Sequence, residues 1–205
     1  IAAEFAGVPF TSPGTTFHEN CASGGAAIHS LARRIMLGEV SLGVAGGVES
    51  LSNVPRYLFS GRIKNQMYGD MTLVDGLFGA LTDTNVGERG ELMGLLTERL
   101  VERYGISREE QDEIAWRSHH AALAAWDEGA FAGYVVPVDV PQRKGPPLIF
   151  DKDEGVRPDS TLEKLAKLPT IYGSPTVTAG NAPGLSTGAS ALVLSTREEA
   201  IRRGV

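Results

Sequence analysis

Apolar residues recur every three or four positions along residues 22–37. These residues are Ala26, Ala27, Leu31, Ile35 and Met36. This spacing places them on one side of an α-helix, and the glycine at position 38 is a typical helix stop. We therefore predict an amphipathic helix over residues 22–37.

Two shorter apolar runs predict buried strands. Residues 41–47, with the sequence SLGVAGG, follow the predicted helix, and residues 189–194 lie near the end of the chain. The second run precedes a capping pattern from Ser195 to Glu198, which predicts a further helix. An extended segment near Thr15 precedes the first helix. The order of strand, helix and strand predicts a βαβ unit.

The middle of the chain is longer, more charged and less regular. Residues 92–104 and 108–127 have helical spacing, and Ser107 with Glu110 three residues later predicts a capping box at the start of the second helix. Prolines at positions 137, 141, 146, 147 and 158 predict that the next stretch is mostly loop.

These changes along the chain predict its domain organisation. We expect an α/β core formed by residues 1–50 and 176–205, with an inserted α-rich domain at residues 51–175. The 205 residues contain 42% apolar side chains, which is enough to bury a core.

Charge and hydropathy narrow the classes of partner. With 25 acidic and 19 basic residues the net charge is −6, and no basic stripe favours nucleic acid. No apolar stretch reaches the roughly 18 residues that span a bilayer, and the N-terminal residues lack a basic segment leading into an apolar one. We expect no nucleic-acid partner, no membrane anchor and no signal peptide.

Cys21 is the single cysteine, in the sequence HENCASGGAA. A lone cysteine excludes an internal disulfide and a cysteine-based metal cluster, and it favours a reduced, cytoplasmic setting. At the start of a helix, backbone N–H groups and the helix dipole favour the thiolate and can bind the oxygen of an attacked carbonyl. Alternatively, Cys21 is a small apolar residue that packs beside a glycine-rich turn. The residues themselves leave both interpretations of Cys21 open.

Several segments, in order, resemble the thiolase family. They are TTFHENCASGGAAIHSLARRIMLGE at residues 15–39, VSLGVAGGVESLSNVP at 40–55, ISREEQDEIAWRSHHAALAAWDEGAF at 106–131, DEGVRPDSTLEKLAKL at 153–168 and TVTAGNAPGLSTGASALVLST at 176–196. The resemblance covers essentially the whole chain. It implies part of the N-terminal half of the α/β thiolase fold, a mixed sheet with layered helices, and an inserted α-rich loop domain that contacts coenzyme A.

The resemblance also implies roles for particular residues. Cys21 matches the nucleophile that accepts an acyl group as a thioester, and its N–H matches half of an oxyanion hole. The positions that match coenzyme A contacts are Leu92 and Met93 in the pantetheine tunnel, Arg157 at the nucleotide end, and Ala179 and Gly180 along the pantetheine. Coenzyme A and acyl-CoA are then substrates, no metal or permanently bound cofactor is implied, and the full-length protein is expected to be a homodimer or homotetramer.

Three residues depart from the family pattern. Pro183 stands where many thiolases have a serine, Thr187 where an aspartate is usual, and Leu92 where some biosynthetic members have a histidine. The first change removes a hydrogen bond to the ligand. These departures leave the acyl chain length and the direction of the reaction open.

The second half of a thiolase has no counterpart in these residues. That half supplies a histidine in a Gly-His-Pro motif, an asparagine in an Asn-Glu-x-Ala segment, and a second cysteine in a Cys-x-Gly motif. We expect the four histidines present, His18, His29, His119 and His120, to be structural or surface residues. We therefore expect these residues to be part of a longer protein. By themselves we expect them to lack full turnover.

Two alternatives remain beside a thiolase. A β-ketoacyl synthase shares the fold and a cysteine at the start of a helix, but it lacks the long insertion before TVTAGN. A non-catalytic thiolase-like protein that binds acyl-CoA or a partner chain would leave Cys21 chemically inert.

Overall fold

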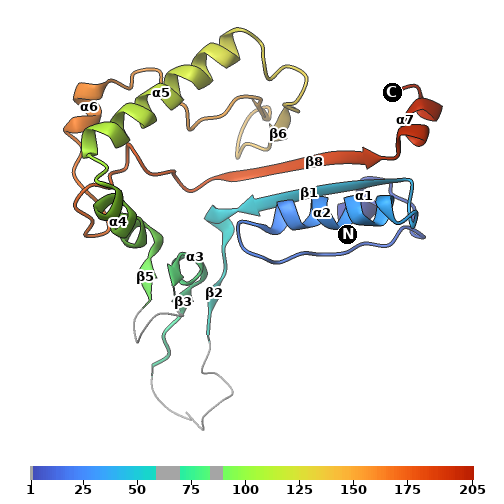
Figure 1. The fold of residues 1–205 in the computed structure, drawn as a ribbon, viewed down its shortest axis with the longest axis horizontal. Coiled ribbons are helices and arrows are strands. Elements are labelled where there is room, and N and C mark those ends of the chain that lie inside the picture. The colour runs from blue at the N-terminus through green and yellow to red at the C-terminus, as the bar shows by residue number, and fades with distance from the viewer. Residues whose placement is uncertain (1, 59–69, 84–89) are drawn as a thin grey trace. The chain divides into compact units, whose positions relative to one another are not determined.

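The computed structural model describes residues 2–58, 70–83 and 90–205 (Figure 1). The chain forms two compact units, one of Ile1–Ala80 with Leu185–Val205 and one of Leu81–Gly184. The predicted division into a core and a loop domain at residues 50 and 176 concerns the family's domains and stays a prediction.

The first unit is built on a long antiparallel strand pair. β1 (Leu42–Ser50) pairs with β8 (Thr187–Ser195) over nine residues, from Leu42 opposite Ser195 to Ser50 opposite Thr187. Gly46 permits the close approach of the two strands, because a Cβ there would lie 2.3 Å from the Ser190 carbonyl oxygen. The structure thus confirms both predicted strands and joins segments far apart in the sequence.

The amphipathic helix covers one face of this strand pair. α2 (Ser23–Met36) runs along β1, as Figure 1 shows, and its ends lie one residue inside the predicted range. A Cβ on Gly43 would lie 2.6 Å from the Leu31 side chain, so the helix packs directly on the strand. Ala45 is buried, whereas Val44 and Val48 are exposed. Alternation of side chains along the strand explains this contrast, so the strand is buried on the α2 side only.

Two expectations about this unit are wrong. Residues near Thr15 form no strand in the described part of the chain, and β1 pairs with β8 in antiparallel fashion, so the βαβ unit is absent there. The capping pattern also shifts by one residue. Ser195 still belongs to β8, and the Thr196 side chain accepts from the Glu199 N–H to open α7 (Arg197–Arg203).

Short elements complete the first unit. They are α1 (Ala2–Phe5), the 3-10 turn η1 (Leu51–Asn53), β2 (Arg56–Tyr57), β3 (Val74–Asp75) and α3 (Gly76–Ala80). β2 and β3 pair in antiparallel fashion.

The second unit contains the two predicted middle helices. α4 (Met93–Tyr104) begins after Leu92, whose extended backbone ends the strand β5 (Glu91–Leu92). β5 pairs with β4 (Thr82–Asp83). α5 (Arg108–Asp127) opens with the predicted capping box, in which Ser107 and Glu110 exchange side-chain to backbone hydrogen bonds.

The proline-rich stretch is more regular than expected. It contains the hairpin of β6 (Val138–Val140) and β7 (Leu148–Phe150), and it is followed by α6 (Leu162–Ala166). α6 packs against α5, and Leu165 is buried there. None of the helices in the described ranges is long and apolar enough to cross a membrane.

Candidate active site

The Cys21 loop is held by hydrogen bonds within a few residues. Asn20 adopts a left-handed backbone conformation with φ of 50°, which turns the chain before the cysteine. The Ser23 hydroxyl donates to the Asn20 carbonyl at 2.7 Å and accepts from the Glu19 N–H at 2.9 Å. Ser23 therefore fixes the backbone that precedes Cys21, a role that we did not predict.

Cys21 itself is exposed and lies just outside the helix. α2 begins at Ser23 with Ala22 as its capping residue, so Cys21 precedes the helix start at which we expected it to lie. The Ala22 N–H donates to the Glu19 carbonyl at 3.0 Å, and the Ser23 N–H donates to the Asn20 carbonyl at 3.2 Å. Both N–H groups are used inside the turn.

Space surrounds this loop. A Cβ on Gly24 or Gly25, in the first turn of α2, would meet no atom within 4 Å beyond the backbone of that turn. A shallow pocket of about 350 Å³ is lined by the following residues of the loop and α2: Phe17, Glu19, Ala26, His29, Ser30, Arg33 and Arg34.

The residues predicted to contact coenzyme A all belong to the second unit, whereas Cys21 belongs to the first. Leu92 is half-buried and Met93, which starts α4, is 52% exposed. Arg157 is exposed, and its backbone N–H donates to His119 Nδ1 at 3.2 Å. His119 on α5 therefore holds the loop of Arg157, in agreement with a structural role for this histidine.

Ala179 and Gly180 lie in a tight turn with the sequence TAGN. Thr178 is fully buried, and its N–H donates to Asn181 Oδ1 at 2.7 Å. Its hydroxyl accepts from the Gly180 N–H at 3.2 Å. A Cβ on Gly180 would lie 2.5 Å from methyl groups of Leu165 and Leu168. The turn therefore packs closely on α6 and the residues after it, and these two leucine side chains would have to shift to admit a larger residue.

Side chains of α5 hold one end of this turn. Asn181 Nδ2 donates to Asp112 Oδ1 at 3.2 Å and to the Thr176 carbonyl at 3.1 Å. Asp112 is buried and pairs with Arg108 Nε at 2.8 Å. Because a buried carboxylate is costly unless it is paired and hydrogen-bonded, this network stabilises one arrangement of the turn.

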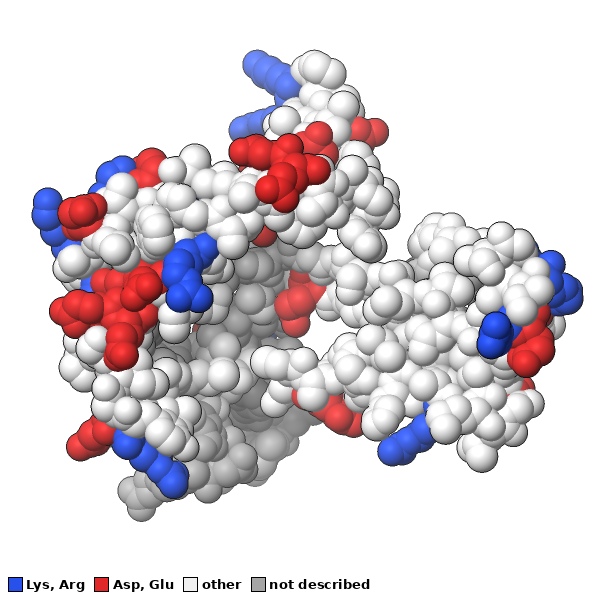
Figure 2. Space-filling view, turned by 45° about the horizontal axis from the view of Figure 1, so that its top comes forward, with Lys and Arg blue, Asp and Glu red and all other residues white. Residues whose placement is uncertain are grey.

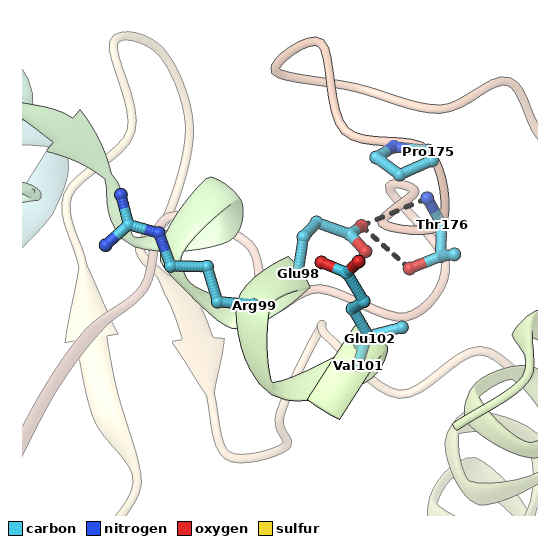
Figure 3. Close-up of a pocket in the computed structure, with 6 residues that line it drawn as sticks. All are labelled: Glu98, Arg99, Val101, Glu102, Pro175 and Thr176. Carbon is cyan, nitrogen blue, oxygen red and sulfur yellow. Dashed lines mark hydrogen bonds between the residues drawn. The ribbon is translucent and has the colours of Figure 1, made fainter. Parts of the chain in front are cut away.

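Glu98 of α4 holds the segment before the turn (Figure 3). One of its carboxylate oxygens accepts from the hydroxyl groups of Ser174 and Thr176 and from the N–H groups of Thr176 and Val177. The Thr176 hydroxyl lies 2.7 Å away. Burial raises the pKa of Glu98, but these hydrogen bonds to the ionised form outweigh burial, so the pKa lies below the ordinary glutamate value.

An open pocket of about 330 Å³ lies beside this contact. Its lining residues, drawn in Figure 3, are Glu98, Arg99, Val101, Glu102, Pro175 and Thr176. The sequence carried no signal for the role of Glu98, because its partners are more than seventy positions away.

Metal-ligating side chains form no competing cluster within the described residues. No group of three or more His, Cys, Asp or Glu side chains there could hold a metal ion. On the face that Figure 2 shows, basic side chains lie scattered among acidic and uncharged ones and form no continuous stripe.

Comparisons with known proteins agree with the resemblance. The family described as "Thiolase, N-terminal domain" matches residues 1–198. The chain is 41% identical over 210 residues to a probable acetyl-CoA acyltransferase of Staphylococcus epidermidis, covering all of this chain and 52% of that protein. It is 42% identical over 202 residues to an acetyl-CoA acetyltransferase of Chromobacterium violaceum, covering 98% of this chain and 50% of that protein.

Solved structures give the same result for the fold. The acetyl-CoA acetyltransferase of Bacillus anthracis matches with a TM-score of 0.89 and 41% identity, over all of this chain and 51% of that one. Human mitochondrial 3-ketoacyl-CoA thiolase matches with a TM-score of 0.90 and 33% identity, over 98% of this chain and 50% of that one. The predicted fold class, the N-terminal half of the mixed α/β thiolase fold, is confirmed.

The fold and the sequence therefore define an N-terminal thiolase domain. This chain belongs to the thiolase family. It spans about half the length of the curated relatives that it matches.

Proposed function

We propose that this chain is the acyl-accepting part of a thiolase, with Cys21 as its nucleophile. The observation that carries the proposal is the exposed Cys21 thiol on a turn that Ser23 fixes immediately before α2. A nucleophile must be accessible and held in a defined geometry, and this turn provides both properties. Family membership supports acyl transfer as the class of reaction.

The proposed chemistry proceeds in two steps. The Cys21 thiolate attacks the keto carbon of a 3-ketoacyl-CoA and forms a carbon–sulfur bond. The carbon–carbon bond breaks, and its electron pair leaves on acetyl-CoA, which must take up a proton. A second coenzyme A thiolate then attacks the Cys21 thioester, and the cysteine thiolate is released. The reverse sequence condenses two acyl-CoA molecules.

The Cys21 N–H is the proposed oxyanion donor from this loop. The neighbouring N–H groups of Ala22 and Ser23 are already bonded within the turn, which agrees with this choice. The acid that protonates the leaving carbanion belongs to motifs of the family's second half. We therefore propose that these 205 residues carry the acyl-accepting step and lack sustained turnover.

Coenzyme A binding is assigned to the second unit. Leu92, Met93, Ala179 and Gly180 would contact the pantetheine, and Arg157 the nucleotide end, where a guanidinium can pair with phosphate or stack on adenine. One related structure, that of human mitochondrial 3-ketoacyl-CoA thiolase, was solved in complex with CoA at 32% identity to this chain, which supports the ligand class. Coenzyme A enters as a substrate and no permanent cofactor or metal is proposed.

The proposal extends to the setting of the protein. A reduced, cytoplasmic location agrees with the single exposed cysteine. A homodimer or homotetramer is proposed for the full-length protein.

Alkylation of Cys21 tests this function. We expect iodoacetamide to modify Cys21 rapidly, and acetyl-CoA to slow the modification in a concentration-dependent manner. Cys21→Ser is the matched control, which should give no adduct. An inert thiol, or alkylation that acyl-CoA does not slow, would contradict the proposal and favour a non-catalytic binding protein.

A further inference from the structure

Glu98 concentrates several hydrogen bonds on one oxygen. Its Oε1 accepts from two hydroxyl groups and two backbone N–H groups, all within residues 174–177. A carboxylate is suited to this task because it only accepts, whereas a glutamine of the same shape presents an NH₂ group and a neutral oxygen. The charge of Glu98 therefore matters for the contact, beyond the shape of its side chain.

This contact connects two elements that are assigned to the same ligand. α4 begins at Met93, and residues 174–177 lead without interruption into the turn of Ala179 and Gly180. Glu98 therefore fastens the helix that carries one proposed pantetheine contact to the segment that carries two others. It acts through the backbone of that segment.

A second anchor holds the other end of the turn. It also reaches the segment that Glu98 holds, because Asn181 Nδ2 donates to the Thr176 carbonyl and Gln111 Nε2 of α5 donates to the Thr176 hydroxyl. Asn181 bonds to Asp112 of α5, and Gly180 packs on Leu165 and Leu168. Loss of the Glu98 contact should consequently loosen the entry to the turn while α5 and α6 keep the unit folded. The proposed nucleotide contact, Arg157, is tied to His119 of α5 and has no bond to Glu98 among the described residues.

We propose that Glu98 is a positioning residue for acyl-CoA, which sets the backbone of Ala179 and Gly180 against α4 through its hydrogen bonds to residues 174–177. This inference rests on the proposed function, because it takes the pantetheine as the ligand of that turn. Glu98 touches no reacting atom in this account.

The experiment compares two ligands that share the nucleotide end. Coenzyme A carries the pantetheine, and adenosine 3′,5′-bisphosphate lacks it. In Glu98→Gln we expect the affinity for coenzyme A, measured by calorimetric titration of the full 205-residue chain, to fall about tenfold. The affinity for the bisphosphate should stay unchanged.

The matched control is Glu102→Gln. Glu102 lies one turn further along α4 and lines the same pocket, and its side chain makes no bond to residues 174–177 among those described. It should bind both ligands as the wild-type chain does. Thr176→Val provides a second variant from the other side of the contact, should Glu98→Gln fail to fold. It removes the hydroxyl that donates to Glu98 at 2.7 Å and accepts from Gln111 Nε2 at 3.1 Å, and we expect a loss of about threefold for coenzyme A alone.

The outcomes distinguish failure of the role of Glu98 from failure of coenzyme A binding itself. Unchanged coenzyme A affinity in the folded variants would overturn the role of Glu98, and so would an equal loss for both ligands, which indicates general destabilisation. A wild-type chain that binds neither ligand would refute coenzyme A binding, and the inference with it.

Discussion

The two segments assigned to the reaction are held in place by different kinds of contact. The Cys21 loop depends on bonds between residues three and four positions apart, from Ser23 to Asn20 and Glu19. In the TAGN turn, Asn181 bonds to Asp112, which lies 69 positions away along the chain. At the entry to the turn, Thr176 bonds to Glu98, which lies 78 positions away. The first site is therefore a local structure, whereas the second forms only when the tertiary fold of its unit is complete.

The difference has a physical consequence for the stability of the two segments. A nucleophile on a local turn keeps its geometry as long as α2 forms. A ligand contact built from long-range bonds shares the stability of the whole unit, because each of its bonds requires ordering of distant segments. Substitutions should therefore affect the two sites separately.

The largest effect is expected for Gly180→Ala. The new methyl group would collide with Leu165 and Leu168 at 2.5 Å, and overpacking of this kind typically costs about 1–3 kcal/mol in the free energy of unfolding. Urea denaturation should show this loss, together with weaker coenzyme A binding. Alkylation of Cys21 should proceed at the wild-type rate.

Gly184→Ala is the control, because a Cβ there meets no atom within 4 Å. A Gly180→Ala chain as stable as wild type would show that the turn does not pack on α6. Slower alkylation of Cys21 in that chain would remove the distinction between the two sites.

Ser23→Ala is expected to have a smaller effect, which should fall on the Cys21 loop and spare coenzyme A binding. It removes one hydroxyl that makes two hydrogen bonds, which should cost about 1 kcal/mol in the free energy of unfolding. Release of the turn should change the rate of Cys21 alkylation and leave coenzyme A affinity unchanged. Ser30→Ala on the same helix serves as the comparison. Identical alkylation rates in both variants would contradict the role of Ser23.

Acidification should produce the smallest effect, through Glu98. Its pKa is lowered in the folded chain, because hydrogen bonds to the ionised carboxylate outweigh burial, which raises the pKa. The ionised form therefore stabilises the fold fully above the ordinary glutamate pKa, and this contribution is lost as the pH falls through the lowered folded value. The other charged residues of the pocket are Arg99, which pairs with Glu91, and Glu102.

The difference in unfolding free energy between wild type and Glu98→Gln isolates this contribution. It should be constant near neutral pH and shrink as the solution becomes acidic. Urea denaturation at a series of pH values measures it. A difference that does not change with pH would show that the charge of Glu98 does not stabilise the contact.

Sequence patterns predicted the parts of the fold that depend on neighbours along the chain. The helix at residues 108–127 and its Ser107–Glu110 capping box formed as expected, since both depend on residues within one turn. The antiparallel pairing of β1 with β8 did not follow from the sequence, because it joins segments more than a hundred positions apart. For the same reason Glu98 and Asp112 carried no signal of their contacts with the TAGN turn.

The candidate site shows the same division. The motif around Cys21 was visible in the sequence, and Ser23, followed by two glycines, could have been recognised as a helix-start residue. Its actual bonds go to Glu19 and Asn20, before the helix. The local sequence thus indicated a candidate site, and the structure shows how its loop is held.

Acyl transfer to Cys21 tests the central claim most directly. The chain is incubated with acetyl-CoA, digested at acidic pH to preserve thioesters, and mapped by mass spectrometry, with Cys21→Ala treated in parallel. We predict one acetyl group on the peptide of Cys21, none in the variant, and no continuing release of product from acetoacetyl-CoA and coenzyme A. An unmodified Cys21, or an adduct that persists in Cys21→Ala, would contradict the account.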